Sequence, residues 1–275
     1  MNTNSIVQIL QAALDTWNNN LSSIMGLLTT SPANFQGGGI WGMMVNVNGA
    51  LQSIAMGLLV LFFVADLSKQ LTSLAELKRP EVAVKAFVRY AVAQYLVTHG
   101  MEIMSAIFSI AAGIIQKVTH SIVGTDGLTV PPELAQKISA VDFLGSASLW
   151  PVALLLSLGI QVCAIIILIT VYSRFFKLFM YTALSPIAMS AFAGQGTSRH
   201  AMSFLKSYAG VCLEGAIIAI GCIVYTAFAT APVIDPNADA ISMIWKYVTG
   251  VGINMIILIV TIRGSDHLIS KMTGL

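Results

Sequence analysis

Charged residues are scarce in this sequence. Lys, Arg, Asp and Glu make up 9% of its 275 residues, whereas 56% are hydrophobic and the mean hydropathy is +0.82. Soluble proteins average about 25% charged residues, so a water-soluble globule of this composition would have too few charges to cover its surface. The net charge of +2 also argues against a nucleic-acid-binding domain held by bulk positive charge. The composition therefore predicts an integral membrane protein.

Cysteines and catalytic motifs are equally sparse. Cys163, Cys212 and Cys222 all lie in apolar runs, with no CxxC pair and no histidine at metal-ligand spacing. This pattern excludes a secreted disulfide scaffold and favours buried, unreactive thiols. A Ser/His/Asp set, a Walker loop, an HExxH motif and a paired-carboxylate motif are also missing. We therefore predict that the chain is not an enzyme and binds no cofactor or metal.

Five apolar windows are long enough to cross a hydrocarbon core of about 30 Å as helices. They are residues 44–65, 90–115, 149–172, 208–229 and 241–262. A sixth run, residues 178–193, is shorter and carries Ser185-Pro186 in its middle, where proline removes a backbone donor. It predicts a re-entrant or broken helix. The expected fold is thus an all-α, polytopic helical membrane protein with about five transmembrane helices and one re-entrant or broken helix.

The positions of the lysines and arginines predict the orientation of the chain. If the amino terminus is outside and residues 178–193 dip in and return, eleven of the fourteen basic residues lie inside. Only Lys117, Lys137 and Lys246 then lie outside, as the positive-inside rule requires. A full crossing by residues 178–193 would divide the basic residues evenly. We therefore expect an outside amino terminus and a cytoplasmic carboxyl terminus.

Residues 1–43 predict an extracytoplasmic amphipathic helix followed by a Gly-rich joint. Apolar residues recur at helical spacing from Ile6 to Leu28 with polar residues opposite, and Gly37-Gly38-Gly39 follows. The first 68 residues contain no lysine or arginine, which favours packing on a partner over binding to anionic lipid. Residues 44–275 predict the transmembrane helical bundle. Its outer loop, residues 116–148, offers a short helix around Leu134 and Ile138.

Ionisable residues within apolar spans are costly and mark function more often than they do in soluble cores. His99 and Glu102 stand three residues apart on one helical face of the second predicted span. Three interpretations are open: they fix packing while facing the bundle interior or a wet channel, they form a proton relay, or they lie at the membrane interface. Glu214 lies in the 208–229 span and could pair with Arg174 or Lys177 at the inner end of the 149–172 span.

The order of motifs between residues 172 and 228 resembles the TrbL-type polytopic inner-membrane subunit of conjugal transfer and type IV secretion systems. One span ends in Tyr-Ser-Arg174-Phe-Phe-Lys177, a hydrophobic segment holds Ser-Pro186, and Phe-Leu-Lys206 opens another span. Four positions match this pattern. With the three ionisable residues above they form the candidate translocation-path or packing residues: His99, Glu102, Arg174, Lys177, Pro186, Lys206 and Glu214.

The resemblance implies a multi-pass channel or scaffold subunit of the bacterial cytoplasmic membrane that helps translocate a DNA–protein substrate. Its expected partners are the lipid bilayer, other type IV secretion membrane subunits, a cytoplasmic conjugation ATPase, further copies of itself and, transiently, the transferred single-stranded DNA–protein complex. Two alternatives remain open: a small-molecule or proton-coupled permease that uses His99 and Glu102, and a pore-forming structural membrane protein. The lack of an inverted repeat disfavours the permease.

Overall fold

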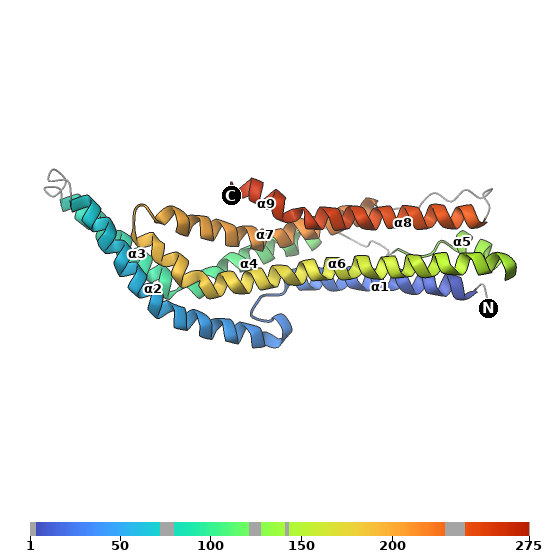
Figure 1. Ribbon diagram of the computed structural model, residues 1–275, viewed down its shortest axis with the longest axis horizontal. Helices are drawn as coiled ribbons and strands as arrows, with labels where there is room; N and C mark the ends of the chain where they lie inside the picture. The colour runs from blue at the N-terminus through green and yellow to red at the C-terminus, as the bar shows by residue number, and fades with distance from the viewer. Residues whose placement is uncertain (1–3, 72–79, 121–127, 141–142, 229–239, 275) are drawn as a thin grey trace. The chain divides into compact units, whose positions relative to one another are not determined.

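The computed structural model describes residues 4–71, 80–120, 128–140, 143–228 and 240–274. Within these ranges the secondary structure is helical and contains no strand, which confirms the all-α prediction (Figure 1). The elements are α1 (Asn4–Thr29), η1 (Phe35–Gly38), α2 (Gly39–Leu71), α3 (Pro80–Thr98), α4 (Gly100–His120), α5 (Pro132–Ser139), α6 (Phe143–Ser190), η2 (Ala191–Ala193), α7 (Ser198–Phe228), α8 (Ala240–Arg263) and α9 (Ser265–Thr273).

Five stretches of the described chain are long and apolar enough to cross a membrane, as the sequence predicted. They are Phe35–Lys69, Gly100–Thr119, Trp150–Ala193, Ser198–Thr226 and Ile241–Met272. The second begins ten residues later than the predicted 90–115 window, because the helix is interrupted at His99. The segment before this interruption belongs to α3, which carries Lys85 and Arg89. Arg89 pairs with Asp66 of α2 at 2.9 Å.

The predicted break at Ser185-Pro186 is not present, and this expectation is corrected. The helix α6 runs without interruption from Phe143 to Ser190, so residues 178–193 do not double back on themselves. Proline deprives the carbonyl four residues earlier, that of Thr182, of its helical donor. Two other groups donate to this carbonyl instead: the Asn48 side-chain amide at 2.7 Å and the Ser185 hydroxyl at 2.9 Å. Substitute donors of this kind allow proline within a membrane helix.

The chain divides into two compact units, each described by itself. The first unit comprises Met1–Thr29, Ile115–Tyr172 and Ala216–Ser265, and the second comprises Thr30–Ile114, Ser173–Gly215 and Asp266–Leu275. The helices α4, α6 and α7 therefore contribute residues to both units. All contacts discussed below lie within one unit or the other.

In the first unit, the predicted amphipathic helix is confirmed as α1. Its apolar face is covered within the unit: Trp17 meets the ring of Tyr225 edge-on, with centroids 5.8 Å apart, and α1 packs against α5. Its polar side chains hold the loop before α5, since Asn18 exchanges two hydrogen bonds with the backbone of Leu128. The apolar face of α1, which we expected to contact a membrane surface or a partner, is thus covered by other helices of the same chain.

Part of the predicted outer loop, residues 116–148, is also described in the first unit. The short helix predicted there is α5, whose residues Leu134 and Ile138 are buried. Just before it, Tyr247 of α8 donates to the carbonyl of Thr129, and α5 packs on α8. The loop is therefore anchored to two helices of its own unit.

In the second unit, the connection from α1 to α2 is a tight turn. Gly37 and Gly38 adopt left-handed φ values of 73° and 81°, which favour glycine. Phe35 of η1 is buried and stacks on Phe175 of α6, with ring centroids 4.0 Å apart. The Gly-rich joint of the sequence prediction therefore lies against a membrane-span helix.

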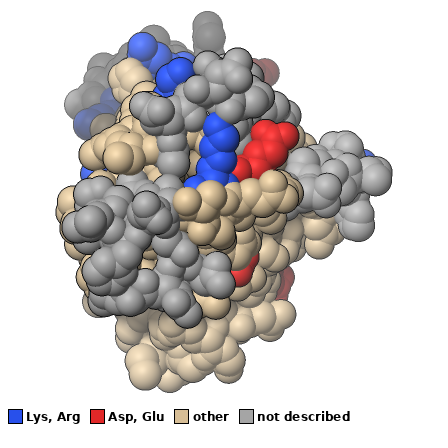
Figure 2. Space-filling model, turned by 90° about the vertical axis from the view of Figure 1, so that its right-hand side faces the viewer, with Lys and Arg blue, Asp and Glu red and all other residues tan. Residues whose placement is uncertain are grey.

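The surface of the described chain is largely apolar. On the face shown in Figure 2, Lys, Arg, Asp and Glu occupy a small part of the described surface. In the second unit, α2 and α3 lie side by side and expose large hydrophobic side chains, among them Leu61, Phe87 and Tyr95 (Figure 1). Such surfaces are stable in hydrocarbon and costly in water, so they agree with a membrane setting.

Candidate functional site

Arg174, a residue that the family resemblance marks, is fully enclosed in the second unit. It has 0% exposure, and it donates from Nε to the carbonyl of Val211 and from Nη2 to that of Cys212, both at 3.0 Å. Its guanidinium carbon also lies 5.8 Å from the ring centroid of Phe108 on α4. A buried guanidinium is tolerable only where such contacts replace its hydration. Arg174 thus joins α6 to α4 and α7.

The space for this guanidinium exists because residue 215 is glycine. A side-chain carbon at Gly215 would lie 2.6 Å from Cζ of Arg174 and 2.7 Å from both terminal nitrogens. Small residues are frequent throughout this span, so the sequence alone does not single out Gly215. The structure gives Gly215 a specific partner, which links the choice of a small residue on α7 to a charged residue on α6.

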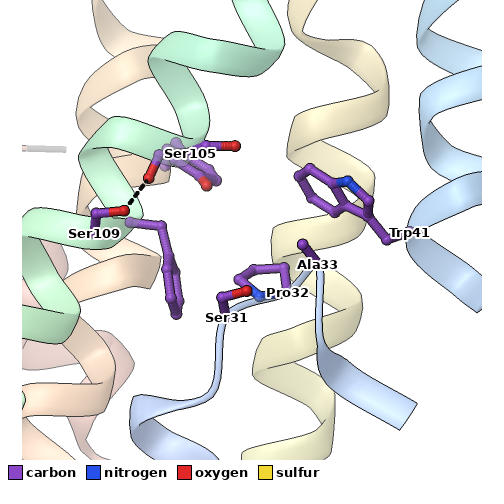
Figure 3. A pocket seen from close by; sticks show the side chains of 8 residues that line it. Ser31, Pro32, Ala33, Trp41, Ser105 and Ser109 are labelled. Carbon is purple, nitrogen blue, oxygen red and sulfur yellow. Dashed lines mark hydrogen bonds between the residues drawn. The ribbon is translucent and has the colours of Figure 1, made fainter. Parts of the chain in front are cut away.

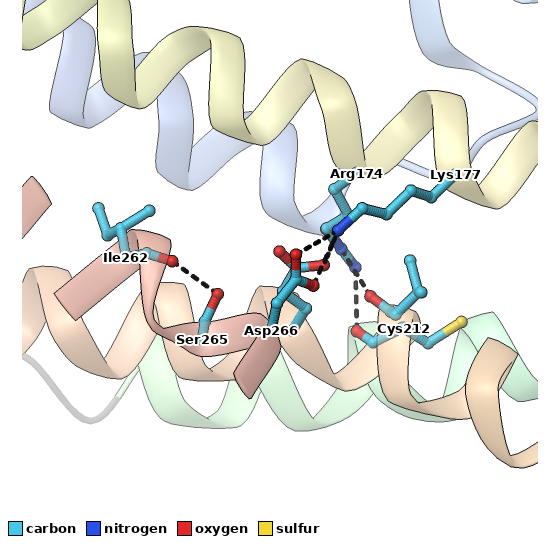
Figure 4. A network of polar contacts seen from close by, with 8 residues as sticks. Arg174, Lys177, Cys212, Ile262, Ser265 and Asp266 are labelled. Atoms are coloured by element: carbon cyan, nitrogen blue, oxygen red, sulfur yellow. Dashed lines mark hydrogen bonds and ion pairs between the residues drawn. The ribbon is translucent and has the colours of Figure 1, made fainter. Parts of the chain in front are cut away.

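One turn of helix after Arg174, Lys177 forms the centre of a second polar group. Its ammonium donates to both carboxylate oxygens of Asp266, at 2.8 and 2.6 Å, and lies 3.6 Å from Oε2 of Glu214 (Figure 4). Glu214 is buried, whereas Asp266 is 60% exposed. The structure therefore pairs Glu214 with Lys177, the second of the two partners that the sequence offered. It also adds Asp266 from α9, which the sequence analysis missed.

Pro186 is buried beside the polar cluster already described on α6. The Asn48 amide also lies 3.1 Å from the Ser185 hydroxyl, so one side chain of α2 contacts two groups of α6. The first residue of α4, Gly100, faces the same place, and a side-chain carbon there would be 3.1 Å from Oγ of Ser185. The contacts of Asn48 could not be predicted from the sequence, because a single polar residue within an apolar window belongs to no motif.

The remaining predicted residues do not join these clusters. His99 lies at the interruption between α3 and α4, where its ring stacks on Tyr95 with centroids 4.2 Å apart. Glu102 is exposed in the first turn of α4, and no ion pair joins it to His99 among the described residues. Lys206 is exposed on α7. A carboxylate at a helix start is favoured by the helix dipole, which is sufficient reason for Glu102 to lie there.

A pocket of about 110 Å³ lies between the α1–α2 turn and α4 (Figure 3). The turn contributes Ser31, Pro32 and Ala33, and α4 contributes Ser105, Phe108 and Ser109; Trp41 and Tyr208 complete the lining. Tyr208 donates its hydroxyl to the carbonyl of Met104 at 2.9 Å. Phe108 is also the ring beside Arg174, so the pocket and the buried arginine share a wall.

These features define a class: a polytopic helical membrane protein whose internal charges mostly bind other parts of the same chain. The family model described as "TrbL/VirB6 plasmid conjugal transfer like protein" matches residues 17–186, well over half of the chain. The chain therefore belongs to the TrbL/VirB6 plasmid conjugal transfer-like family. Comparisons with curated proteins and with solved structures found no match.

The match confirms the resemblance, although it lies largely on another part of the chain. Of the four motif positions, Arg174, Lys177 and Pro186 fall within residues 17–186 and Lys206 falls beyond them. The buried Glu214, which is not a motif position, also falls beyond them. Family membership and the five apolar helices together describe a multi-pass membrane protein of conjugal transfer.

Proposed function

We propose that the chain is a channel or scaffold subunit of a conjugative type IV secretion system that helps translocate a DNA–protein substrate across the cytoplasmic membrane. The observation that carries this proposal is the family match over residues 17–186. The five apolar helices support it, since they give the subunit its place in the bilayer. The chain itself is proposed to hydrolyse nothing, so the energy would come from a partner.

Within this function, Arg174, Lys177, Glu214 and Pro186 are proposed to brace the helices rather than to contact the substrate. Nε and Nη2 of Arg174 bind carbonyls of α7, and Lys177 pairs with carboxylates of α7 and α9. Groups that are already bonded within the chain are poorly placed to meet phosphates in transit, and Arg174, Glu214 and Pro186 are also buried. A bracing role predicts that substitutions there lower stability first, and transfer only as a consequence.

The proposed orientation places the amino terminus and residues 1–43 outside, residues 44–275 in the bundle with its outer loop, and the carboxyl terminus in the cytoplasm. With residues 178–193 continuous with the third apolar stretch, its support is the connection between the first and second stretches, which holds Lys78, Arg79, Lys85 and Arg89, whereas the connection between the second and third holds Lys137 alone. Cysteines introduced at Asn19, an exposed position of α1, and at exposed Gly196 test it in whole cells. An impermeant maleimide should label the first only, and labelling of Gly196→Cys from outside would refute the orientation.

The proposed partners are the other membrane subunits of the secretion system, its cytoplasmic ATPase, further copies of this chain and, transiently, the single-stranded DNA–protein complex. Isolation of a tagged chain in mild detergent tests this assembly. We expect the other membrane subunits to co-purify with it, and to be lost when an unrelated multi-pass protein carries the tag. A chain that purifies alone and transports a small solute in vesicles would instead support the permease alternative.

A further inference from the structure

Part of the exposed surface of α4 in the second unit is polar, whereas a helix surface that faces lipid is apolar. Glu102, Ser105 and Ser109 are all exposed and, at about 100° per residue, fall within an arc of roughly 60°. The neighbouring Ile110 is 68% exposed and points about 100° away from Ser109. The helix therefore presents one polar and one apolar surface to its surroundings.

The depth of this polar face follows from the length of the span. The stretch Gly100–Thr119 has 20 residues, which is just enough for a hydrocarbon core of about 30 Å. At 1.5 Å per residue, Ser109 lies roughly 14 Å from the start of the span, close to the middle of the membrane. Polar side chains at that depth avoid lipid and face protein or water.

The α1–α2 turn meets α4 at the level of these serines, so this part of residues 1–43 would reach into the bundle from the outer side. Ser31, Pro32 and Ala33 line one pocket with Ser105 and Ser109, as Figure 3 shows. The backbone that follows them is irregular, with left-handed φ values at Gln36, Gly37 and Gly38. Non-helical backbone at membrane depth is tolerated only where protein buries it or where it lines a water-filled cavity. Here the pocket is open at exposed Ser105 and Ser109, so protein burial is incomplete.

We propose that this hydroxyl-lined pocket, together with the Glu102–Ser105–Ser109 face of α4, is a water-filled site near the middle of the membrane that admits small neutral solutes. Hydroxyl groups and an acidic side chain recognise water and hydrogen-bonding solutes. The Ser109 hydroxyl donates to the carbonyl of Ser105 at 2.9 Å, but its oxygen and the Glu102 carboxylate would find no donors in lipid. The proposal deepens the proposed function, since it makes the subunit line part of an aqueous path, but it needs only that α4 crosses the membrane.

Thiol chemistry tests the proposal in whole cells that make the full-length chain. The variants are Ser105→Cys and Ser109→Cys, and the matched control on the same helix is Ile110→Cys. The thiolate is the reactive form, and apolar surroundings suppress it. N-ethylmaleimide should therefore label the two serine positions at least about tenfold faster than position 110, after subtraction of the labelling of Cys163, Cys212 and Cys222 in the unaltered chain.

Two results would overturn the proposal. Equal and slow labelling at all three positions would place the serine face against lipid or a protein partner, and equal and fast labelling would place this part of α4 outside the membrane. If either serine variant fails to accumulate in the membrane, Ser31→Cys from the turn replaces it, with the same expectation. The readout needs no DNA transfer, so failure here is distinct from failure of the proposed function.

Discussion

Replacing Gly215 by alanine should destabilise the second unit more than the same replacement at a helical glycine with free space around it. The added carbon would lie 2.6 Å from Cζ of Arg174, so the guanidinium must move away from its two carbonyl partners. Because these partners are main-chain atoms of α7, they cannot follow it. The contact with Phe108 at 5.8 Å would change as well.

The expected cost can be worked from these contacts. Each hydrogen bond to a charged group contributes about 1.5–3 kcal/mol, so the loss of two costs about 3 kcal/mol or more. This corresponds to more than about 100-fold in the folding equilibrium. On the scale of globular proteins of similar length, the melting temperature should fall by roughly 6 °C or more. Thermal unfolding of the detergent-purified chain measures this shift.

The matched control is Gly113→Ala on α4, where a side-chain carbon would meet nothing within 4 Å. That substitution should leave the melting temperature unchanged or raise it, because alanine favours the helix by up to about 1 kcal/mol. In an Arg174→Leu background, Gly215→Ala should add little further loss. Equal melting temperatures for Gly215→Ala and Gly113→Ala would refute the assigned packing of Arg174.

Five further substitutions test the other polar residues. Asn48→Leu should lower the stability measured by thermal unfolding by about 1 kcal/mol, because the Thr182 carbonyl freed by the proline then keeps only the Ser185 hydroxyl as a donor. Adding Pro186→Ala should restore most of this stability, since alanine returns the backbone donor. A double variant that is as unstable as Asn48→Leu alone would contradict this explanation. Lys177→Met should cost about 3–5 kcal/mol, because it removes the cation beside the buried Glu214 carboxylate. Asp266→Asn at the exposed end should cost less than about 1 kcal/mol, and the reverse order would be evidence against the network. If His99 and Glu102 form a proton relay, Glu102→Gln should change how the frequency of conjugal transfer depends on pH. An unchanged pH profile would exclude the relay.

The sequence was sufficient for the architecture because the bilayer imposes length and composition on every span. Five windows of about 20 apolar residues predicted the five candidate spans, and helical periodicity predicted α1 and α5. The error at Pro186 has a physical cause. Whether proline breaks a helix depends on other donors for the freed carbonyl, and Asn48 lies 134 positions from that carbonyl in the chain.

The candidate site was predictable only in part. The pairing of Glu214 with Lys177 was one of two pairings that the cost of charge in an apolar span suggested. The burial of Arg174 was not predicted, because the sequence placed this residue at the inner end of its span. Gly215 and Asp266 could not be assigned, because nothing local distinguishes this glycine from the others in α7 or ties an aspartate of α9 to α6. Tertiary contacts decided both, and a sequence pattern within one helix does not record them.

The measurement that tests the central claim most directly is the frequency of conjugal transfer from a donor strain that carries an in-frame deletion of the gene, with and without the gene supplied in trans. We predict that the deletion abolishes transfer, leaves growth unchanged, and is reversed by the wild-type chain. Gly113→Ala should restore transfer as well as the wild type does. Normal transfer from the deletion strain would contradict the assignment of this chain to the conjugation machine.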